Sequence, residues 1–213
     1  MPHLLDKERL LKELKVRKVH VYPRLLAELP PETAARFSSP WDTVERLAAA
    51  LRPLPMGALH FLLASPTGAI VIAPGGSRYA RGPQTLHRTR LENVAFVSAA
   101  DLLEGDVAPL RAVVYLYDHL LGSAGAADGP CLSGGVGIMP GWTEAATQIP
   151  RLFALGHNPD PLCRRSPADY FAHSVAQYAV CPRDLNAADP NMHKLLARSF
   201  FSESFWRQKN ADS

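Results

Sequence analysis

Two histidines in the second half of the chain are spaced for metal or acid–base chemistry. His119 ends the run Y-L-Y-D-H of residues 115–119, and His173 lies within Y-F-A-H-S-V-A-Q-Y of residues 170–178. Both runs have the apolar spacing of helices. Tyr115 precedes His119 by one helical turn on the same face, so its phenol oxygen could join two imidazole nitrogens around a metal ion. The side chains therefore allow a small metal site or a group of mutual hydrogen bonds.

The two runs together resemble the metal-bearing helices of zincin metallopeptidases, in the branch of the anthrax lethal factor catalytic domain. A zincin carries H-E-x-x-H on one helix, where both histidines bind zinc and the glutamate activates water. Residues 115–122, Y-L-Y-D-H-L-L-G, are similar to that stretch at His119, the apolar residues after it and the glycine. The second helix of this branch has a pattern like Y/F-F-A-E-x-F-x-x-Y, and here His173 replaces its ligand glutamate. The resemblance implies a zincin-like fold over about residues 58–205.

The resemblance also implies a loss of activity. Tyr115 stands where the first ligand histidine would be, and Leu116 stands where the catalytic glutamate would be. Leucine cannot take a proton from a metal-bound water. Asp118 cannot replace it, because two residues further on it points about 200° round the helix from Leu116. We therefore expect a catalytically degenerate protein that acts as a binding or scaffold module and does not hydrolyse peptides.

Two alternatives remain open at this point. One is a metal-dependent hydrolase with altered ligands around His119 and His173, helped by Asp118 or Tyr115, with zinc or another divalent metal as cofactor. The other has no cofactor, and the histidines and Tyr115 bond one another in the old cleft. The side chains expected to line that cleft or join its hydrogen bonds are Tyr115, Asp118, Tyr170 and Tyr178.

The first 55 residues read as a helical arm. Residues 4–21 place Leu4, Leu11 and Leu14 on one stripe with Leu10 beside it, which predicts an amphipathic helix. Its basic residues face only two glutamates, and one of these, Glu8, is spaced to pair with a lysine four residues later. A basic helix of this kind can bind nucleic acid, although it carries no aromatic residues for stacking on bases.

Strands are expected ahead of the motif helices. Apolar runs at residues 58–64 and 69–73 flank S-P-T-G and predict a β-hairpin, and residues 93–98 predict a third strand. The rest of the chain reads as helical. Strands followed by helices are typical of the α+β class, so the prediction is a zincin-like domain over residues 56–207 with a small N-terminal sheet and a disordered tail at residues 208–213.

Helix ends are marked by capping residues and prolines. Asp42 with Glu45 three residues on predicts a capping box, and Gly122 predicts the end of the first motif helix. Further helix starts are predicted at Asp106, Ser166-Pro167 and Asp189-Pro190.

Composition limits the remaining choices. The chain has 213 residues, 47% of them hydrophobic, which is enough to bury a core without disulfides or structural metal. Three cysteines without paired spacing favour a reducing compartment, and no secretory signal or membrane-span pattern is visible, so we expect a cytoplasmic protein. The net charge of +3 does not by itself indicate a nucleic-acid partner. A protein partner is the remaining expectation, and an aromatic cluster at residues 200–206 is expected to dock on the core.

Overall fold

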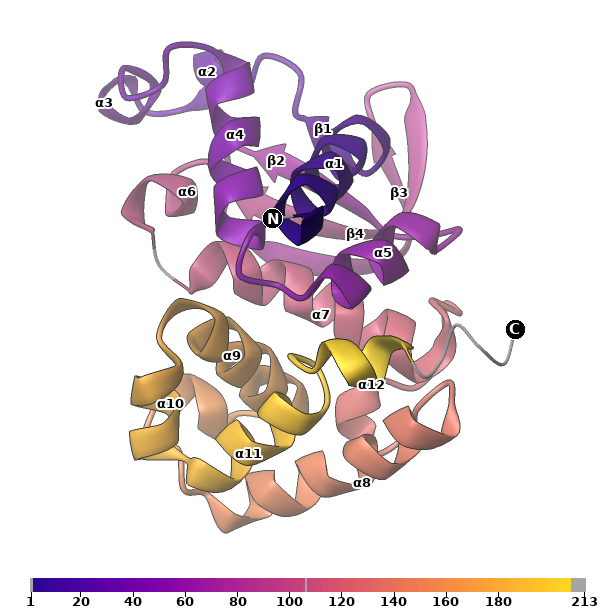
Figure 1. The fold of residues 1–213 in the computed structure, drawn as a ribbon. Helices are drawn as coiled ribbons and strands as arrows, with labels where there is room; N and C mark the ends of the chain where they lie inside the picture. The colour runs from indigo at the N-terminus through magenta and orange to yellow at the C-terminus, as the bar shows by residue number, and fades with distance from the viewer. Residues whose placement is uncertain (1, 106, 208–213) are drawn as a thin grey trace.

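The computed structural model describes residues 2–105 and 107–207. It shows an α+β protein in which a four-stranded sheet and most of the early helices lie on one side of helix α7, and the later helices lie on the other (Figure 1). The strands are β1 (Val19–Val21), β2 (Ala69–Ala73), β3 (Arg78–Leu86) and β4 (Thr89–Ser98). The helices before α7 are α1 (Pro2–Arg17), α2 (Leu25–Glu28), α3 (Pro31–Ala34), α4 (Pro40–Leu51), α5 (Met56–Ala64) and α6 (Asp101–Glu104).

The later half of the chain is helical, as the α+β class predicts. It contains α7 (Ala108–Ser123), η1 (Leu132–Gly134), α8 (Pro140–Leu155), η2 (Pro161–Arg164), α9 (Pro167–Val180), α10 (Pro182–Ala188), α11 (Pro190–Arg198) and α12 (Glu203–Arg207). Helices α7 and α9, which carry the two motifs, pack against each other.

The sheet is mixed and has the strand order β1-β2-β4-β3. Strands β1, β2 and β4 are parallel, and β3 is antiparallel to β4. One face of the sheet, with Ile70 and Val97, joins the main core, while the other face packs against Leu86 and Leu91 of the β3–β4 hairpin. Because strand side chains alternate between faces, the continuous burial of β2 indicates cover on both sides.

The expected hairpin at residues 58–73 is wrong in its first half. Residues 58–64 belong to helix α5, and its buried residues recur at helical spacing, at Ala58, Leu59, Leu62 and Leu63. This run lacks β-branched residues, whereas A-I-V-I-A in β2 is rich in them. The real hairpin joins β3 to β4, and its turn includes His87 in the left-handed backbone region at φ 55°.

The segment expected as an N-terminal arm is built into the fold. Helix α1 ends at Arg17, and residues 19–21 form strand β1 beside β2 instead of continuing the helix to residue 21. Leu10, Leu11 and Leu14 lie in the same core as the later helices, as the stripe predicts. The side chain of Leu4 lies outside the described residues. Glu8 contacts Arg52 and not the lysine four residues later.

The predicted helix ends are partly confirmed. Ser166 accepts the Asp169 N–H and Asp189 accepts the Met192 N–H, as expected of the caps of α9 and α11. The prediction that Asp42 caps a helix is wrong, because α4 starts one turn earlier at Ser39-Pro40. Its expected partner Glu45 contacts Lys15 instead.

Two further predicted ends need comment. Helix α7 runs one residue past Gly122, and Ala124 supplies the left-handed cap. Gly122 serves a different purpose, since a Cβ there would lie 2.5 Å from the backbone of Leu132. The predicted cap at Asp106 and the predicted disordered tail at residues 208–213 lie outside the described residues.

The aromatic segment near the C-terminus docks on the core, as predicted. Phe200 is fully buried and Trp206 is 6% exposed, and α12 packs on α5. Glu203 of α12 accepts the N–H groups of Met56 and Gly57, so a carboxylate from the end of the chain caps the start of α5. Gly57 is required for this approach, because its missing Cβ would lie 2.1 Å from the Trp206 Cβ.

We therefore predict that Gly57→Ala lowers the free energy of unfolding by about 1–3 kcal/mol, because α12 must move away from α5. Gly76→Ala is the matched control, since a Cβ at Gly76 meets nothing within 4 Å. Urea unfolding followed by circular dichroism measures both variants. Equal stability of the two variants would contradict the packing described here.

Candidate functional site

Helix α7 is buried along most of its length and carries the first motif. Twelve of its sixteen residues are buried, among them Leu116, Asp118 and His119. A polar group inside a protein must find a hydrogen-bond partner or lose several kcal/mol. The partners found by its polar side chains therefore decide what chemistry the helix can do.

His119 faces the sheet. Its Nε2 lies 2.8 Å from the Ala126 carbonyl oxygen, which can only accept, so Nε2 carries the proton. The Tyr79 hydroxyl of β3 then donates to Nδ1 over 2.6 Å. Burial lowers the pKa of His119, which agrees with a neutral ring that donates at one nitrogen and accepts at the other.

Asp118 faces the loop that follows α7. The Ser133 N–H and hydroxyl each donate to one of its carboxylate oxygens over 2.7 Å. Burial raises the pKa of Asp118 to about 6, and the two bonds from Ser133 only partly oppose this effect. Asp118 therefore holds η1 against α7 and is separated from the cleft expected between the motif helices.

Tyr115 faces the start of α9. Its hydroxyl donates to Asp169, whose other carboxylate oxygen accepts from the Ser166 hydroxyl over 2.6 Å. Burial first, and the bond to Asp169 second, raise the pKa of Tyr115. The tyrosine is therefore a neutral hydrogen-bond donor that ties α7 to the N-terminal cap of α9.

His173 lies one turn after Asp169 on α9 and faces η2. Its Nε2 is 3.4 Å from a carboxylate oxygen of Asp160, the residue that caps η2. The two histidines thus take different partners, His119 on the sheet side of α7 and His173 on the η2 side of α9. Tyr115 turns toward Asp169, so the expected bonding of these three side chains to one another is not the arrangement observed.

The other two expected cleft residues also have separate partners. The Tyr170 hydroxyl donates to Asp189 over 2.6 Å, which joins α9 to the cap of α11. The Tyr178 ring stacks on Phe201 with ring centroids 4.1 Å apart. Each of these side chains joins a helix to its neighbour.

The side chains as arranged do not fit a zinc ion held by His119, His173 and Tyr115. Zinc needs deprotonated ligand atoms that point at one centre. Both ring nitrogens of His119 already have protein partners, and the Tyr115 hydroxyl donates to a carboxylate. Within residues 2–105 and 107–207, no group of three or more His, Cys, Asp or Glu side chains is placed to hold a metal.

Sequence reasoning missed the residue at the centre of the sheet-side contacts, Asn93. It is buried in the left-handed backbone region at φ 57°, and its side-chain oxygen accepts the Gly82 N–H over 2.9 Å. Its amide donates to the Gly125 carbonyl over 2.7 Å. An asparagine at the start of an apolar strand pattern is the available signal, since asparagine tolerates positive φ.

Arg81 of β3 also contacts the loop after α7. It donates to the Gly129 carbonyl over 3.0 Å and to the Cys131 sulfur. Burial raises the pKa of Cys131 to about 11, so the residue is a thiol and not a nucleophilic thiolate at neutral pH.

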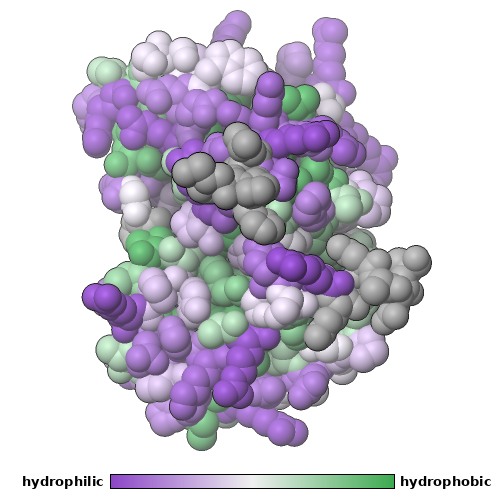
Figure 2. Space-filling model, in the orientation of Figure 1, coloured by the Kyte–Doolittle hydropathy of each residue, from purple (hydrophilic) through white to green (hydrophobic). Residues whose placement is uncertain are grey.

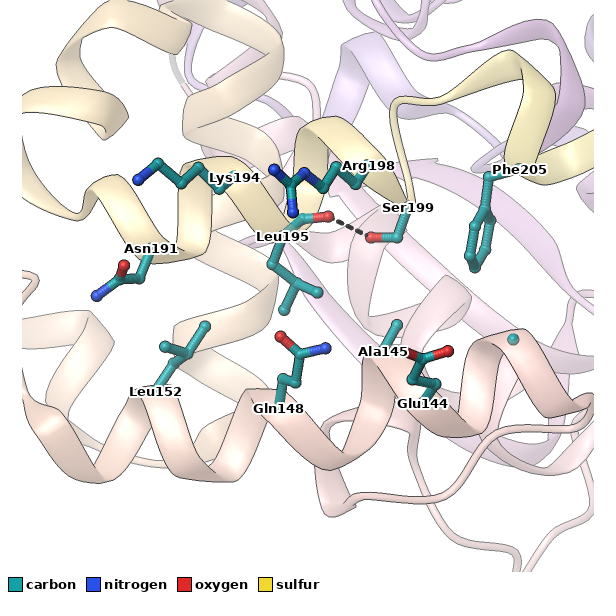
Figure 3. A pocket seen from close by; sticks show the side chains of 11 residues that line it. Glu144, Ala145, Gln148, Leu152, Asn191, Lys194, Leu195, Arg198, Ser199 and Phe205 are labelled. Carbon is teal, nitrogen blue, oxygen red and sulfur yellow. Dashed lines mark hydrogen bonds between the residues drawn. The ribbon is translucent and has the colours of Figure 1, made fainter.

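A separate groove of about 470 Å³ lies between α8 and α11, away from these contacts (Figure 3). Arg198 of α11 and Gln148 of α8 lie on opposite sides of it, above an apolar floor that includes Leu195. Its charged and amide side chains are exposed to solvent, whereas Ser199 is buried, and none of the motif residues contributes to the lining.

Comparison with known proteins finds no relative: no protein-family model, no curated protein and no solved structure matches the chain. Among the described residues, no helix is both long and apolar enough to cross a membrane.

The buried carboxylate of Asp118 gives a pH-dependent prediction. Its pKa is raised in the folded state, so the folded protein binds this proton more tightly than the unfolded chain. Its contribution to stability is present below about pH 4 and is lost as the pH rises through about 6. In Asp118→Asn the amide oxygen can still accept the Ser133 N–H, the amide NH2 can donate to the Ser133 hydroxyl oxygen, and the side chain carries no charge.

We therefore expect Asp118→Asn to exceed the wild type in free energy of unfolding by about 1–3 kcal/mol at pH 7.5, and to match it near pH 4. Urea unfolding at the two pH values measures the difference. Asp128→Asn, at an exposed position, is the control and should leave the pH dependence unchanged. The same pH dependence in wild type and Asp118→Asn would contradict the assignment.

Proposed function

We propose that the chain is a catalytically degenerate, zincin-like protein that acts as a binding or scaffold module. The observation that carries this proposal is the use of the three H-E-x-x-H positions. Tyr115 bonds to Asp169, Leu116 is fully buried, and both ring nitrogens of His119 have partners. In this arrangement the helix stabilises the fold through the positions that would otherwise bind zinc and activate water.

The relation between the two motif helices and the sheet supports the zincin-like part of the proposal. Helix α7 packs on β4 and on α9, and the antiparallel edge strand β3 approaches α7 through Tyr79 and His119. The pattern of residues 170–178 therefore lies beside residues 115–122, as the resemblance requires. The burial of Leu116 beside Gly68, the residue before β2, explains why a leucine suits this position.

Metal content and peptide cleavage test the proposal. Untagged protein, incubated with zinc and desalted, should retain less than about a tenth of an equivalent, because a site needs ligands free to converge. Its melting temperature should be the same with and without chelator. Cleavage of casein should stay at the level of a blank.

Zinc-dependent cleavage that His119→Ala abolishes would contradict the proposal. It would favour the alternative of a metal-dependent hydrolase. His60→Ala, an exposed histidine on α5, is the matched control for loss of one imidazole. Stoichiometric metal bound without cleavage would leave a binding role but would contradict the hydrogen-bonded state of His119.

A further inference from the structure

Strand β1 forms one edge of the sheet. The Ile70 N–H donates to the Lys18 carbonyl over 2.8 Å, and the Tyr22 N–H donates to the Ile72 carbonyl over 2.9 Å. A parallel ladder uses the backbone N–H and C=O groups of alternate residues. The backbone groups of His20 therefore also point toward β2, and those of Val19 and Val21 point away from it. Among the described residues, none hydrogen-bonds to the outward N–H and C=O groups of Val19 and Val21.

A groove of about 850 Å³ runs along this free edge. On one side it is walled by Val16 of α1 and by Trp41 and Val44 of α4, and on the other side by the tip of the β3–β4 hairpin at residues 86–89. Strand β1 itself is part of the lining. An added strand would lie between the two walls and direct alternate side chains toward each.

The helix-side wall is unusually apolar for a surface. Trp41 is 73% exposed and Val16 is 79% exposed, and both line the groove. Exposed aromatic side chains with a polar tip are typical anchors of peptide contacts. The chain's other two tryptophans are buried, Trp142 at 1% and Trp206 at 6% exposure.

The charged lining is mainly basic. Lys12 and Lys15 line the groove, and the single acidic residue in its lining, Glu45, contacts Lys15 over 2.7 Å. His20 also lines it, and burial lowers the pKa of its ring, so the excess positive charge comes from the lysines. In Figure 2 hydrophilic residues cover much of the part of the molecule where α1 lies, with hydrophobic atoms between them. A partner that carries acidic side chains would complement this rim.

We propose that an extended, acidic peptide segment of a partner protein binds here by adding a strand to β1. Its backbone bonds to Val19 and Val21, its apolar side chains contact Trp41 and Val16, and its carboxylates lie near Lys12 and Lys15. The proposal rests on the binding function proposed above and gives it a surface and a partner class. Main-chain bonds to a sheet edge supply affinity in this mode, and side-chain contacts supply specificity.

A second copy of the chain is a poorer occupant. Strand β1 has only three residues and lies between the α1–α4 wall and the hairpin tip. Its own walls would collide with those of another copy before two β1 edges could meet. A single extended strand is thin enough to enter.

The test uses a synthetic peptide, acetyl-Asp-Val-Glu-Val-Asp-Ile-Glu-amide, and the intrinsic fluorescence of Trp41. Binding should shift the emission to shorter wavelength, because Trp41 is the exposed tryptophan and becomes covered. Two further peptides carry N-methyl groups at alternate residues. In the first peptide the methyl groups replace the N–H groups that face β1, which should weaken binding about tenfold. In the second they replace the N–H groups that face away from β1, and the affinity should change less than about twofold.

Protein variants separate the strand edge from the rest of the groove. Val21→Pro removes one outward N–H and leaves the ladder to β2 intact, so binding should fall about tenfold while the melting temperature changes little. Val21→Thr keeps the N–H and should bind like the wild type. If Val21→Pro fails to fold, the two N-methylated registers still decide the question.

Several results would overturn the proposal. They are no emission shift up to about 1 mM peptide, equal weakening in both N-methylated registers, or equal binding of a peptide with lysine at every acidic position. Self-association of the chain that Val21→Pro removes would assign the edge to a second copy instead. A negative peptide-binding result would leave the zinc and cleavage results unaffected, so the two proposals can fail separately.

Discussion

The structure depends on the burial of one helix that carries polar side chains on several faces. Helix α7 lies between the sheet and the later helices, so Tyr117, Asp118 and His119 are buried away from water and Tyr115 is half-buried. Each finds its partner on a different element: Tyr115 on α9, Tyr117 on α5, Asp118 on η1 and His119 on β3. The hydrogen bonds required by this one helix therefore fix the positions of the elements packed around it.

The same constraint leaves little room for a catalytic metal on this helix. A zinc site leaves an opening at the metal, where substrate and water enter. Here the corresponding stretch of α7 faces packed side chains, and Leu116 contributes apolar volume at a position where a carboxylate would need solvent or a metal. Tyr115 and His119 are neutral hydrogen-bonding groups here, as the directions of their pKa shifts indicate.

One edge of the sheet is left uncovered among the described residues, in contrast to the closely packed later helices. The later helices close on one another through caps and aromatic contacts, such as the bond from Tyr170 to the Asp189 cap of α11 and the T-shaped pair of Trp142 with Phe205. At the opposite end of the molecule the sheet stops at a three-residue strand with its outer edge uncovered among the described residues. Edge strands are usually kept short or charged because they can pair with other chains. The basic, aromatic groove beside β1 makes this edge selective.

The sequence alone determined the features that act over a few residues. The caps at Ser166 and Asp189, the β-branched run of β2 and the leucine at position 116 are all visible in it, because each depends on side chains within about one turn. The helix–strand choice at residues 58–64 was decided by tertiary structure, since an apolar run of that length suits either element. Tertiary structure also decided the partners of the polar residues, because Tyr79 and His119 are 40 positions apart and no local pattern relates them.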